Sequence, residues 1–513
     1  MNHAKYVFVT GGVVSGLGKG ITAASLGRLL TNRGLKVTIQ KFDVYLNVDP
    51  GNMSPYRHGE IFVTDDGAET DIDVGHYERF LGKHFTVANN STTGKIYQNV
   101  ISRERSGEFN GRDIQVIPHI TDEIITQMKA VADGNDVVII ELGGTIGDIE
   151  SMAHVEAIRQ FRKKLGPQGS VLLHLTLIPY LEASGEIKTK PTQNSVRDLS
   201  RLGVTADMIV CRTSAHVKLD AETKEKLVMY CNLDSVEDVI HAKDARSIYE
   251  VPLLLKEQNM DDIVLKKLGL KAPKGDMREW EKMVDGLTNG GTPKTIAVVG
   301  KYVEVPDAYL SVSEAIRAAA LATHVKPTIK FIHAEDVEKH GAKKMLQGAD
   351  AIIVPSGFGK RGLEGKMLTA QYARENKTPF LALGGLGMSS TVLEFAKNVA
   401  KIKDEKELFK KGDVMRLGLY KCALTPGSKA HAQYGKAEIA ERHRHKYEFQ
   451  NEFKKQLEDA GLVFSGINKE NDLVEIVEIV ELKDHPYFVA AHFNAEFISK
   501  PYKPHPLFVG LMK

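Results

Sequence analysis

Apolar strands alternate with helical stretches along most of the chain, and this alternation restricts the folds that the chain can adopt. In the first half the apolar segments read KYVFVT, KVTIQKF, DVVIIEL, VLLHLTLI and DMIVC, and a helix is expected at residues 21–32. Continuous apolar strands that are connected by crossover helices form parallel sheets with both faces covered. The pattern therefore predicts an α/β protein built from doubly wound, mainly parallel sheets.

A polar stretch that contains glycine and proline, residues 271–294, interrupts this alternation. The apolar segments then resume as TIAVVGKY, TIKFIHA, DAIIVPSGFG and TPFLALGG. Because 513 residues exceed what a single hydrophobic core usually holds, more than one domain is expected. We predict a first domain at residues 1–270, a linker at 271–294 and a second domain at 295–513.

The composition excludes several classes of partner. A formal net charge of +2 gives no electrostatic footprint for nucleic acid or an anionic membrane. The 3 cysteines are too few and too scattered for a disulfide framework or a CxxC metal site, as is typical of a reducing compartment. No secretory signal precedes the first apolar segment, and no apolar run is long enough to span a bilayer. We expect a cytoplasmic protein without nucleic-acid or membrane partners.

The segment VFVTGGVVSGLGKGITAASL, residues 7–26, is expected to form a strand, a glycine-rich loop and a helix. Backbone N–H groups of such a loop and the helix N-terminus bind phosphate oxygens, and Lys19 supplies positive charge. The spacing departs from the standard P-loop: five residues separate Gly12 from Gly18, and Gly20 stands where serine or threonine normally holds magnesium. The segment therefore predicts a P-loop-like phosphate site whose metal ligands come from elsewhere.

Two carboxylates are candidates for those metal ligands. Glu141 ends the apolar segment DVVIIEL, and open α/β sheets bind ligands at the carboxyl ends of their strands. Asp73 lies in the acidic segment DDGAETDIDVGHYERF. Magnesium is commonly held by one or two carboxylates together with substrate phosphates and water. We therefore predict that Asp73 and Glu141 bind Mg²⁺ near Lys19.

Several segments together resemble the CTP synthase family. In the order of that family's synthetase domain they read VTGGVVSGLGKG, NVDPGNMSPYRHGEIFVTDDGAETDIDVGHYERF, IQVIPHIT, IELGGTIGDIES, SGEIKTKPTQNSVRDL and AKDARSIYEVP. The resemblance covers essentially the whole chain. It implies that ATP phosphorylates O4 of UTP, that ammonia attacks C4, and that phosphate leaves to give CTP. It also implies a homotetramer, CTP as a feedback inhibitor and GTP as a candidate effector.

The resemblance assigns roles to individual positions of the first domain. The ATP-binding residues would be Gly16, Leu17, Gly18, Lys19, Gly20, Ile21, Asp73, Arg212, Lys243, Asp244 and Ala245. The residues for UTP or CTP would be Ser15, Asp148, Ile149, Glu150, Lys188, Thr189, Lys190, Pro191, Thr192, Gln193 and Lys226. The catalytic candidates are Lys19, Lys41 and His119, and the metal ligands are Asp73 and Glu141.

The second domain resembles a class I glutaminase, in which a Cys-His-Glu triad releases ammonia from glutamine. The family's elbow, Cys-Leu-Gly-Met, has Gly385 in place of the cysteine here, with one extra glycine before it. The family's His-Pro-Glu reads Asn494, Ala495 and Glu496, so only the acid of the triad remains. A glycine has no group that can attack a carbonyl, so we predict that this domain has lost its glutaminase activity.

Supporting positions of the glutaminase differ as well. Ser356 replaces the first glycine of the oxyanion turn, and Lys446 stands where the family has a glutamine-binding arginine. The segment of residues 399–415 is also shorter than the corresponding segment in the family. These differences favour a CTP synthase that uses free ammonia. Two alternatives stay open: a glutamine-dependent enzyme with a displaced nucleophile, for which Ser389, Ser390 and His492 are candidates, and a noncatalytic assembly subunit.

Overall fold

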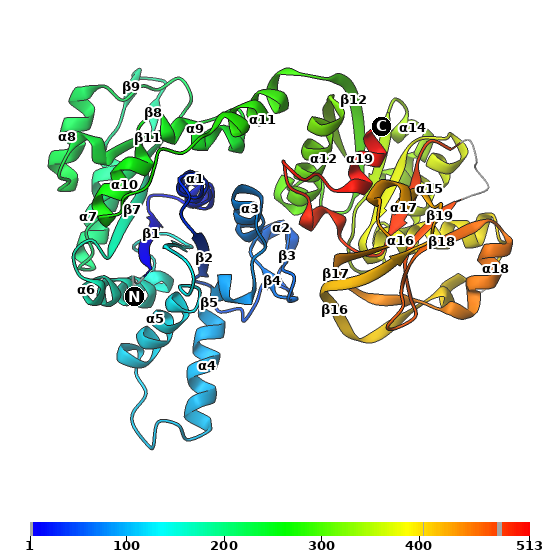
Figure 1. Ribbon diagram of the computed structural model, residues 1–513, viewed down its shortest axis with the longest axis horizontal. Coiled ribbons are helices and arrows are strands. Elements are labelled where there is room, and N and C mark those ends of the chain that lie inside the picture. Colours follow the sequence, from blue (N-terminus) through cyan, green and yellow to red (C-terminus); the bar gives the residue numbers. More distant parts are fainter. Residues whose placement is uncertain (1–3, 404, 480–484) are drawn as a thin grey trace. The chain divides into compact units, whose positions relative to one another are not determined.

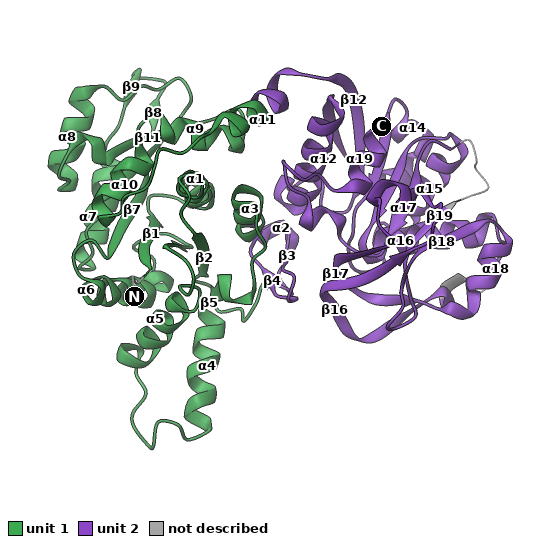
Figure 2. Cartoon of the chain, in the orientation of Figure 1, with its two compact units in different colours: residues 1–50, 73–284 green, residues 51–72, 285–513 purple. Residues whose placement is uncertain are grey.

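A computed structural model describes residues 4–403, 405–479 and 485–513, so residues 1–3 at the start of the first predicted domain lie outside it. The chain forms two compact units, coloured separately in Figure 2. Unit 1 comprises Met1–Pro50 and Asp73–Val284, and unit 2 comprises Gly51–Ile72 and Asp285–Lys513. Both units combine a large sheet with covering helices, which confirms the α/β prediction.

Unit 1 contains a 7-stranded parallel sheet with the strand order β11-β10-β7-β1-β6-β2-β5. Its strands are β1 (Lys5–Gly11), β2 (Val37–Asp43), β5 (Asn90–Thr92), β6 (Val137–Leu142), β7 (Ser170–Leu177), β10 (Met208–Thr213) and β11 (Val239–Lys243). A separate short pair is formed by β8 (Tyr180–Leu181) and β9 (Glu186–Ile187).

Helices cover both faces of this sheet (Figure 1). They are α1 (Lys19–Asn32), α3 (Ile72–Leu81), α4 (Thr93–Arg105), α5 (Thr121–Lys129), α6 (Met152–Leu165), α7 (Lys190–Arg201), α8 (Ala221–Cys231), α9 (Val251–Lys256) and α10 (Met260–Leu268). Side chains of β1 alternate between the faces: Tyr6 and Phe8 join the core formed with α4 to α8, whereas Val7 and Val9 are buried on the face that α1 covers.

Unit 2 contains a 9-stranded mixed sheet with the order β13-β12-β14-β15-β20-β19-β18-β16-β17, parallel from β13 to β20 and antiparallel beyond. The strands are β12 (Thr292–Gly300), β13 (Val325–His333), β14 (Ala351–Val354), β15 (Phe380–Leu383), β16 (Phe409–Leu424), β17 (Glu438–Phe449), β18 (Leu462–Asn468), β19 (Leu473–Ile479) and β20 (Phe488–Ala491).

Two cores lie on opposite faces of the unit 2 sheet. In β12, Ile296 and Val298 join one core, and Ala297 and Val299 join the other. The helices are α12 (Leu310–Thr323), α13 (Ala334–His340), α14 (Ala342–Leu346), α15 (Leu363–Glu375), α16 (Gly384–Asn398), α17 (Lys429–Tyr434), α18 (Lys454–Asp459) and α19 (Pro506–Met512). Within the described residues of the chain, every helix is too short or too polar to cross a lipid bilayer.

Residues 51–72 belong to unit 2, although the sequence pattern had placed them in the first domain. The segment contains α2 (Pro55–His58) and a hairpin of β3 (Phe62–Val63) and β4 (Glu69–Thr70). Arg442 on β17 donates through Nε to Asp65 Oδ1 at 2.6 Å, and the Phe62 and Phe497 rings meet edge to face with centroids 5.3 Å apart. Side-chain contacts over this sequence distance leave no periodic signal, so the sequence could not reveal them.

The predicted linker is partly helical in the structure. It contains α11 (Arg278–Asn289) and the first residues of β12. Trp280, Met283 and Val284 are buried and follow helical spacing, and the Trp280 indole donates to the Tyr249 carbonyl at 2.6 Å. Because polar residues separate these buried positions, the sequence pattern did not predict this short amphipathic helix.

Candidate functional site

The glycine-rich loop of unit 1 follows β1, near the middle of the parallel sheet, and leads into α1. The N–H groups at the start of a helix are free to bind anions, so this loop has the geometry of a phosphate site. Lys19 is the first residue of α1, and its buried Nζ donates to the Gly144 carbonyl at 2.7 Å. Val13 has a φ of 78°, a costly conformation for a β-branched residue, of the kind that is concentrated in ligand-binding loops.

Two carboxylates and a second lysine converge beside this loop. Lys41 on β2 pairs in register with Glu141 on β6, and Lys41 Nζ donates to Glu141 Oε1 at 2.9 Å. The same Nζ forms an ion pair with Asp73, in the first turn of α3. Burial raises the pKa of Glu141, and the Lys41 ammonium opposes that shift. The two acids therefore meet around one cationic group, as ligands of a cation do.

Gly20 explains how the loop departs from the standard P-loop. A Cβ atom at Gly20 would lie 2.1 Å from Asp73 Oδ1, so no serine or threonine fits there while Asp73 occupies this place. Asp73 thus fills the space of the hydroxyl that normally binds magnesium.

The remaining nucleotide candidates of unit 1 mostly follow the carboxyl ends of parallel strands. Arg212 on β10 forms an ion pair with Asp244, just after β11, at 2.7 Å, and Lys243 and Ala245 flank Asp244. Residues 148–150 follow β6 and are exposed, and residues 188–193 follow β7. Within residues 188–193, the buried Gln193 amide donates to Thr189 Oγ1 at 3.1 Å. One edge of the sheet therefore collects these residues from four segments of sequence.

Two candidates are not joined to this group by a described contact. His119 accepts a hydrogen bond from the Gln115 N–H at 3.1 Å and meets the edge of the Phe109 ring, and neither partner belongs to the phosphate loop. Lys226 is an exposed residue of α8.

Two residues that the sequence analysis did not select also adjoin this site. The buried hydroxyl of Tyr77 donates to Glu141. His174 on β7 bonds Thr10 Oγ1 at 2.9 Å and Ser195 Oγ at 2.8 Å, and burial lowers its pKa to about 3, helped by the charge of Lys19. The only sequence signal for His174 is its place inside the apolar run VLLHLTLI.

Unit 2 has a pocket of about 360 Å³, and two of its lining residues, Ser356 and Asn494, adjoin Gly384 at the turn between β15 and α16. Its walls include Ser356, Gly357, Phe358, Arg444, Asn494 and Glu496. The first residue after β15 is Gly384, with a φ of 66°, and a Cβ there would lie 3.2 Å from Asn494 Nδ2. A Cβ at Gly385 would instead meet His445 Cβ at 2.8 Å. The position that faces Asn494 is therefore Gly384, whereas the sequence analysis had selected Gly385.

The partners of Asn494 resemble a triad without its base. Asn494 Nδ2 donates to Glu496 Oε1 at 2.9 Å, and both side chains are buried. Burial raises the pKa of Glu496 to about 8, although the Asn494 hydrogen bond opposes the shift. A carboxyl group with this pKa is largely protonated at neutral pH, and an amide cannot take a proton from a nucleophile.

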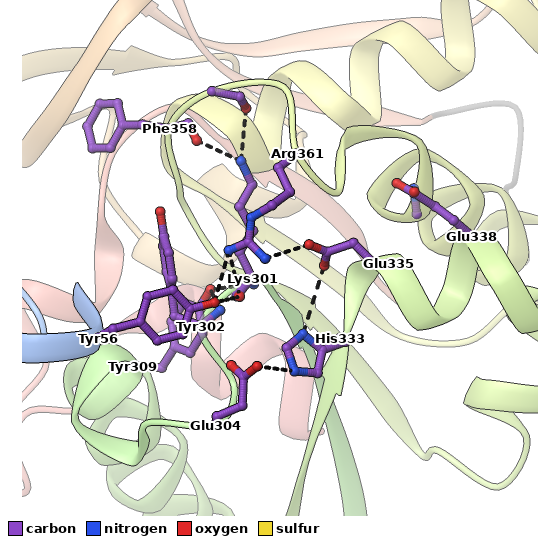
Figure 3. Close-up of polar contacts among 12 residues, drawn as sticks. Tyr56, Lys301, Tyr302, Glu304, Tyr309, His333, Glu335, Glu338, Phe358 and Arg361 are labelled. Carbon is purple, nitrogen blue, oxygen red and sulfur yellow. Dashed lines mark hydrogen bonds and ion pairs between the residues drawn. The ribbon is translucent and has the colours of Figure 1, made fainter. Parts of the chain in front are cut away.

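Lys301 supports the wall of the pocket (Figure 3). Its Nζ donates to the carbonyls of Phe358 and Gly359 at 2.7 and 2.8 Å, which holds the turn that follows Ser356. Arg361 donates to the Lys301 carbonyl at 2.9 Å. Burial and the Arg361 charge lower the pKa of Lys301 to about 8, and nearby Glu335 opposes the shift.

The candidates for a displaced nucleophile have other partners. Ser389 Oγ donates to the Leu386 carbonyl at 3.3 Å and Ser390 Oγ to the Gly387 carbonyl at 2.9 Å, both within α16. The His492 ring stacks on His445 with centroids 3.6 Å apart. Among the described residues, no hydrogen bond joins either serine to His492.

Comparisons with known proteins agree with this arrangement of two sites. The CTP synthase N-terminus family matches residues 5–270, and the glutamine amidotransferase class-I family matches residues 304–513. A phosphate-loop unit joined to an amidotransferase-type unit defines an ATP-dependent carbon–nitrogen ligase. CTP synthases of Carboxydothermus hydrogenoformans and Desulfitobacterium hafniense are 53% and 51% identical to the chain, covering 98% and 99% of it and 97% and 98% of their own lengths.

The chain belongs to the CTP synthase family. It is thus an enzyme that converts UTP to CTP, with ATP as co-substrate and glutamine or ammonia as the nitrogen source. A solved structure, the glutaminase domain of Trypanosoma brucei CTPS with bound acivicin, is also similar, at 32% identity and a TM-score of 0.40 over 43% of this chain and 92% of that one.

Proposed function

We propose that this enzyme makes CTP with free ammonia and that its second unit does not release ammonia from glutamine. The observation that carries the proposal is Gly384: it occupies the turn that faces Asn494, and it has no side chain. Acyl transfer from glutamine needs a nucleophile and a base in contact with it. At this turn neither Gly384 nor Asn494 supplies one.

Unit 1 contains the groups that phosphoryl transfer requires. This reaction depends chiefly on positioning and on stabilisation of the charge that develops on the transferred phosphoryl group. The glycine-rich loop and the α1 N-terminus bind the ATP phosphates, and Lys19 and Lys41 place two ammonium groups beside them. Arg212 and residues 243–245 lie toward the adenosine, and residues 148–150 and 188–193 toward UTP or the product CTP. In this scheme CTP acts as a feedback inhibitor, the enzyme is a homotetramer, and GTP is a candidate effector.

Asp73 and Glu141 fit a Mg²⁺ ion, because both carboxylates already converge on the Lys41 ammonium and Gly20 leaves room for Asp73. The ion would supply charge neutralisation at the transferring phosphates. We expect Asp73→Asn and Glu141→Gln each to raise the Mg²⁺ concentration that gives half-maximal CTP synthesis. Titration of Mg²⁺ at saturating ATP and UTP measures this, and unchanged curves for both variants would contradict the assignment.

The nitrogen source is tested by measuring CTP formed from UTP, ATP and Mg²⁺ with ammonium chloride, with glutamine, or with sodium chloride as the salt control. We expect CTP with ammonium only, and no glutamate from glutamine. A Lys19→Ala sample prepared in parallel reveals any contaminating synthase. Glutamate released by the wild type in proportion to the CTP it forms would overturn the proposal, provided that the Lys19→Ala sample forms no CTP.

A further inference from the structure

Three histidines and two glutamates meet in the interior of unit 2. His443, His445 and Glu448 belong to β17, Glu475 belongs to β19, and His492 directly follows β20. We call this group the histidine cluster. The side chains of His443, Glu475 and His492 are 0% exposed, and that of His445 is 2% exposed. Buried ionisable groups in this number need partners that offset the cost of their desolvation.

Three members of the histidine cluster bring potential ligand atoms close together. His445 Nδ1 lies 3.6 Å from Glu448 Oε1, and His492 Nδ1 lies 3.7 Å from Glu448 Oε2. The three ligand atoms all lie within 4.8 Å of one another. A tetrahedral zinc ion has ligand distances of about 2.0–2.2 Å and so separates its ligand atoms by roughly 3.5 Å. A shared ion therefore requires side-chain rotations that bring these atoms, which lie within 4.8 Å of one another, closer together.

These ligand atoms lack ordinary hydrogen bonds within the described part of the chain. The buried atoms without a hydrogen-bond partner include His445 Nδ1, Glu448 Oε2 and both ring nitrogens of His492, and, on the supporting residues, His443 Nε2 and Glu475 Oε2. The carbonyls of Tyr447 and Val474 lie close to His492, but not in hydrogen-bonding geometry.

The surrounding residues form the support that metal-binding histidines usually have. A ligating histidine normally bonds a second group through its other ring nitrogen, which fixes the tautomer and orientation of the ring. The other ring nitrogen of His445, Nε2, bonds His443 Nδ1 at 2.9 Å. His443 Nε2 faces Glu475 Oε2 at 3.6 Å, and Arg416 donates to Glu475 Oε1 at 2.8 Å. The chain of contacts from His445 thus ends in a carboxylate.

We propose that His445, Glu448 and His492 bind a divalent transition-metal ion of the zinc class in the interior of unit 2. Two imidazoles and one carboxylate suit zinc or cobalt rather than magnesium. Arg416 is the cation nearest to Glu448, at 3.5 Å, but it is paired more closely with Glu475. Because the site is buried, the ion joins β17 to the end of β20 and has no access to nucleotide.

The full chain, expressed without a histidine tag, tests this site directly. After dialysis the purified protein should retain about one zinc per chain by elemental analysis. A chelator-treated sample should regain thermal stability on addition of Zn²⁺ but not of Mg²⁺. Co²⁺ added to the same sample should give the visible absorption bands of a tetrahedral nitrogen and oxygen site. No retained zinc, no Co²⁺ bands and no stabilisation would overturn the proposal.

Variants locate the ion. His492→Gln and Glu448→Gln should abolish the Co²⁺ bands, and His443→Gln, which acts through His445, should weaken metal binding by about 10- to 100-fold. The matched control is His333→Gln: His333 lies 2.9 Å from Glu304 and 3.8 Å from Glu335 in the same unit but outside the histidine cluster. Bands that survive in His492→Gln, or that vanish in His333→Gln, would contradict the assignment. If a variant does not fold, the wild-type Co²⁺ spectrum still decides whether a site exists.

Discussion

Lys19 is a buried lysine at the end of the glycine-rich loop. Burial lowers its pKa, and the Glu141 carboxylate opposes that shift, so the ammonium group is held charged in a place where water screens it poorly. We expect Lys19→Ala to reduce CTP synthesis with ammonium by about 100-fold or more, because the charge that develops on the phosphoryl group loses its nearest cation. Initial rates measure this, and the exposed Lys36→Ala is the control. Near-normal rates in a folded Lys19→Ala would show that the loop is not the ATP site.

The buried carboxyl group of Glu496 should make the free energy of unfolding depend on pH. Its pKa rises from 4.5 to about 8 on folding because the carboxyl group is buried. Between these values the folded state holds a proton that the unfolded state has released, so the free energy of unfolding falls as pH rises, by at most about 1.4 kcal/mol per pH unit. The contribution is complete below pH 4.5 and is lost by about pH 8.

Glu496→Gln removes this dependence, because the amide keeps an acceptor for Asn494 and carries no charge. We expect the variant and the wild type to have similar stability near about pH 5, and the variant to be the more stable near about pH 8. Denaturation curves of the full chain at several pH values measure the difference, with Glu438→Gln, an exposed acid of the same unit, as the control. A difference that shrinks as pH rises would contradict a buried, protonated Glu496.

At the scale of elements, the turn from β15 into α16 packs closely against Ser356. A Cβ at Gly384 would lie 2.4 Å from Ser356 Oγ and 2.5 Å from Ser356 Cβ. Ser356 therefore occupies the space that a side chain at position 384 would need. Gly384 also has a positive φ, a backbone conformation that is strained for residues with a side chain and is of the kind found in a nucleophile elbow.

This steric coupling predicts the outcome of restoring the thiol. Gly384→Cys alone should destabilise the protein, whereas Gly384→Cys with Ser356→Gly should fold and be alkylated by a glutamine-mimicking electrophile. Glutamate release should stay absent, because Asn494 is not a base, and adding Asn494→His should give at most feeble hydrolysis, since a misplacement of about 1 Å costs around a hundredfold. Thiol labelling, melting temperature and glutamate release measure these steps. Equal stability of the single and double variants would contradict the clash, and Gly385→Cys is the matched comparison.

Features that are set by neighbouring residues could be predicted from the sequence, whereas features that depend on three-dimensional contacts could not. Buried parallel strands are continuous apolar runs, so both sheets and the order of their domains could be predicted, and Lys19, Asp73 and Glu141 could be selected from loop and strand-end positions. The helix containing Trp280 was missed because polar residues separate its buried positions. The choice between Gly384 and Gly385 depends on a backbone angle and on which residue each position faces. Neither can be obtained from the sequence alone.

At the scale of the whole molecule, the chain does not divide into two consecutive halves. It leaves unit 1 after Pro50, contributes residues 51–72 to unit 2, returns for residues 73–284, and then completes unit 2. The inserted segment is bound by charged and apolar contacts. Arg444 donates to Glu69 Oε1 at 2.8 Å and to the Gly51 carbonyl at 3.0 Å, and the Ser311 N–H donates to Glu60 at 2.6 Å.

The fragment of residues 285–513 therefore lacks part of its own fold. Arg442, whose side chain is 0% exposed in the full chain, loses Asp65 and the Val63 carbonyl, and Phe497 loses the Phe62 ring. Removing a hydrogen-bonded partner of a buried charge destabilises a fold. We expect the fragment to melt below the corresponding transition of the full chain, and a synthetic peptide of residues 51–72 to raise its melting temperature in a concentration-dependent way. The matched control is the same peptide with Asp65→Ala and Glu69→Ala, which keeps Phe62 and the backbone acceptors of Arg442 and Arg444 but removes both ion pairs. A fragment as stable as the full chain, or equal stabilisation by both peptides, would show that these ion pairs do not hold residues 51–72 in unit 2.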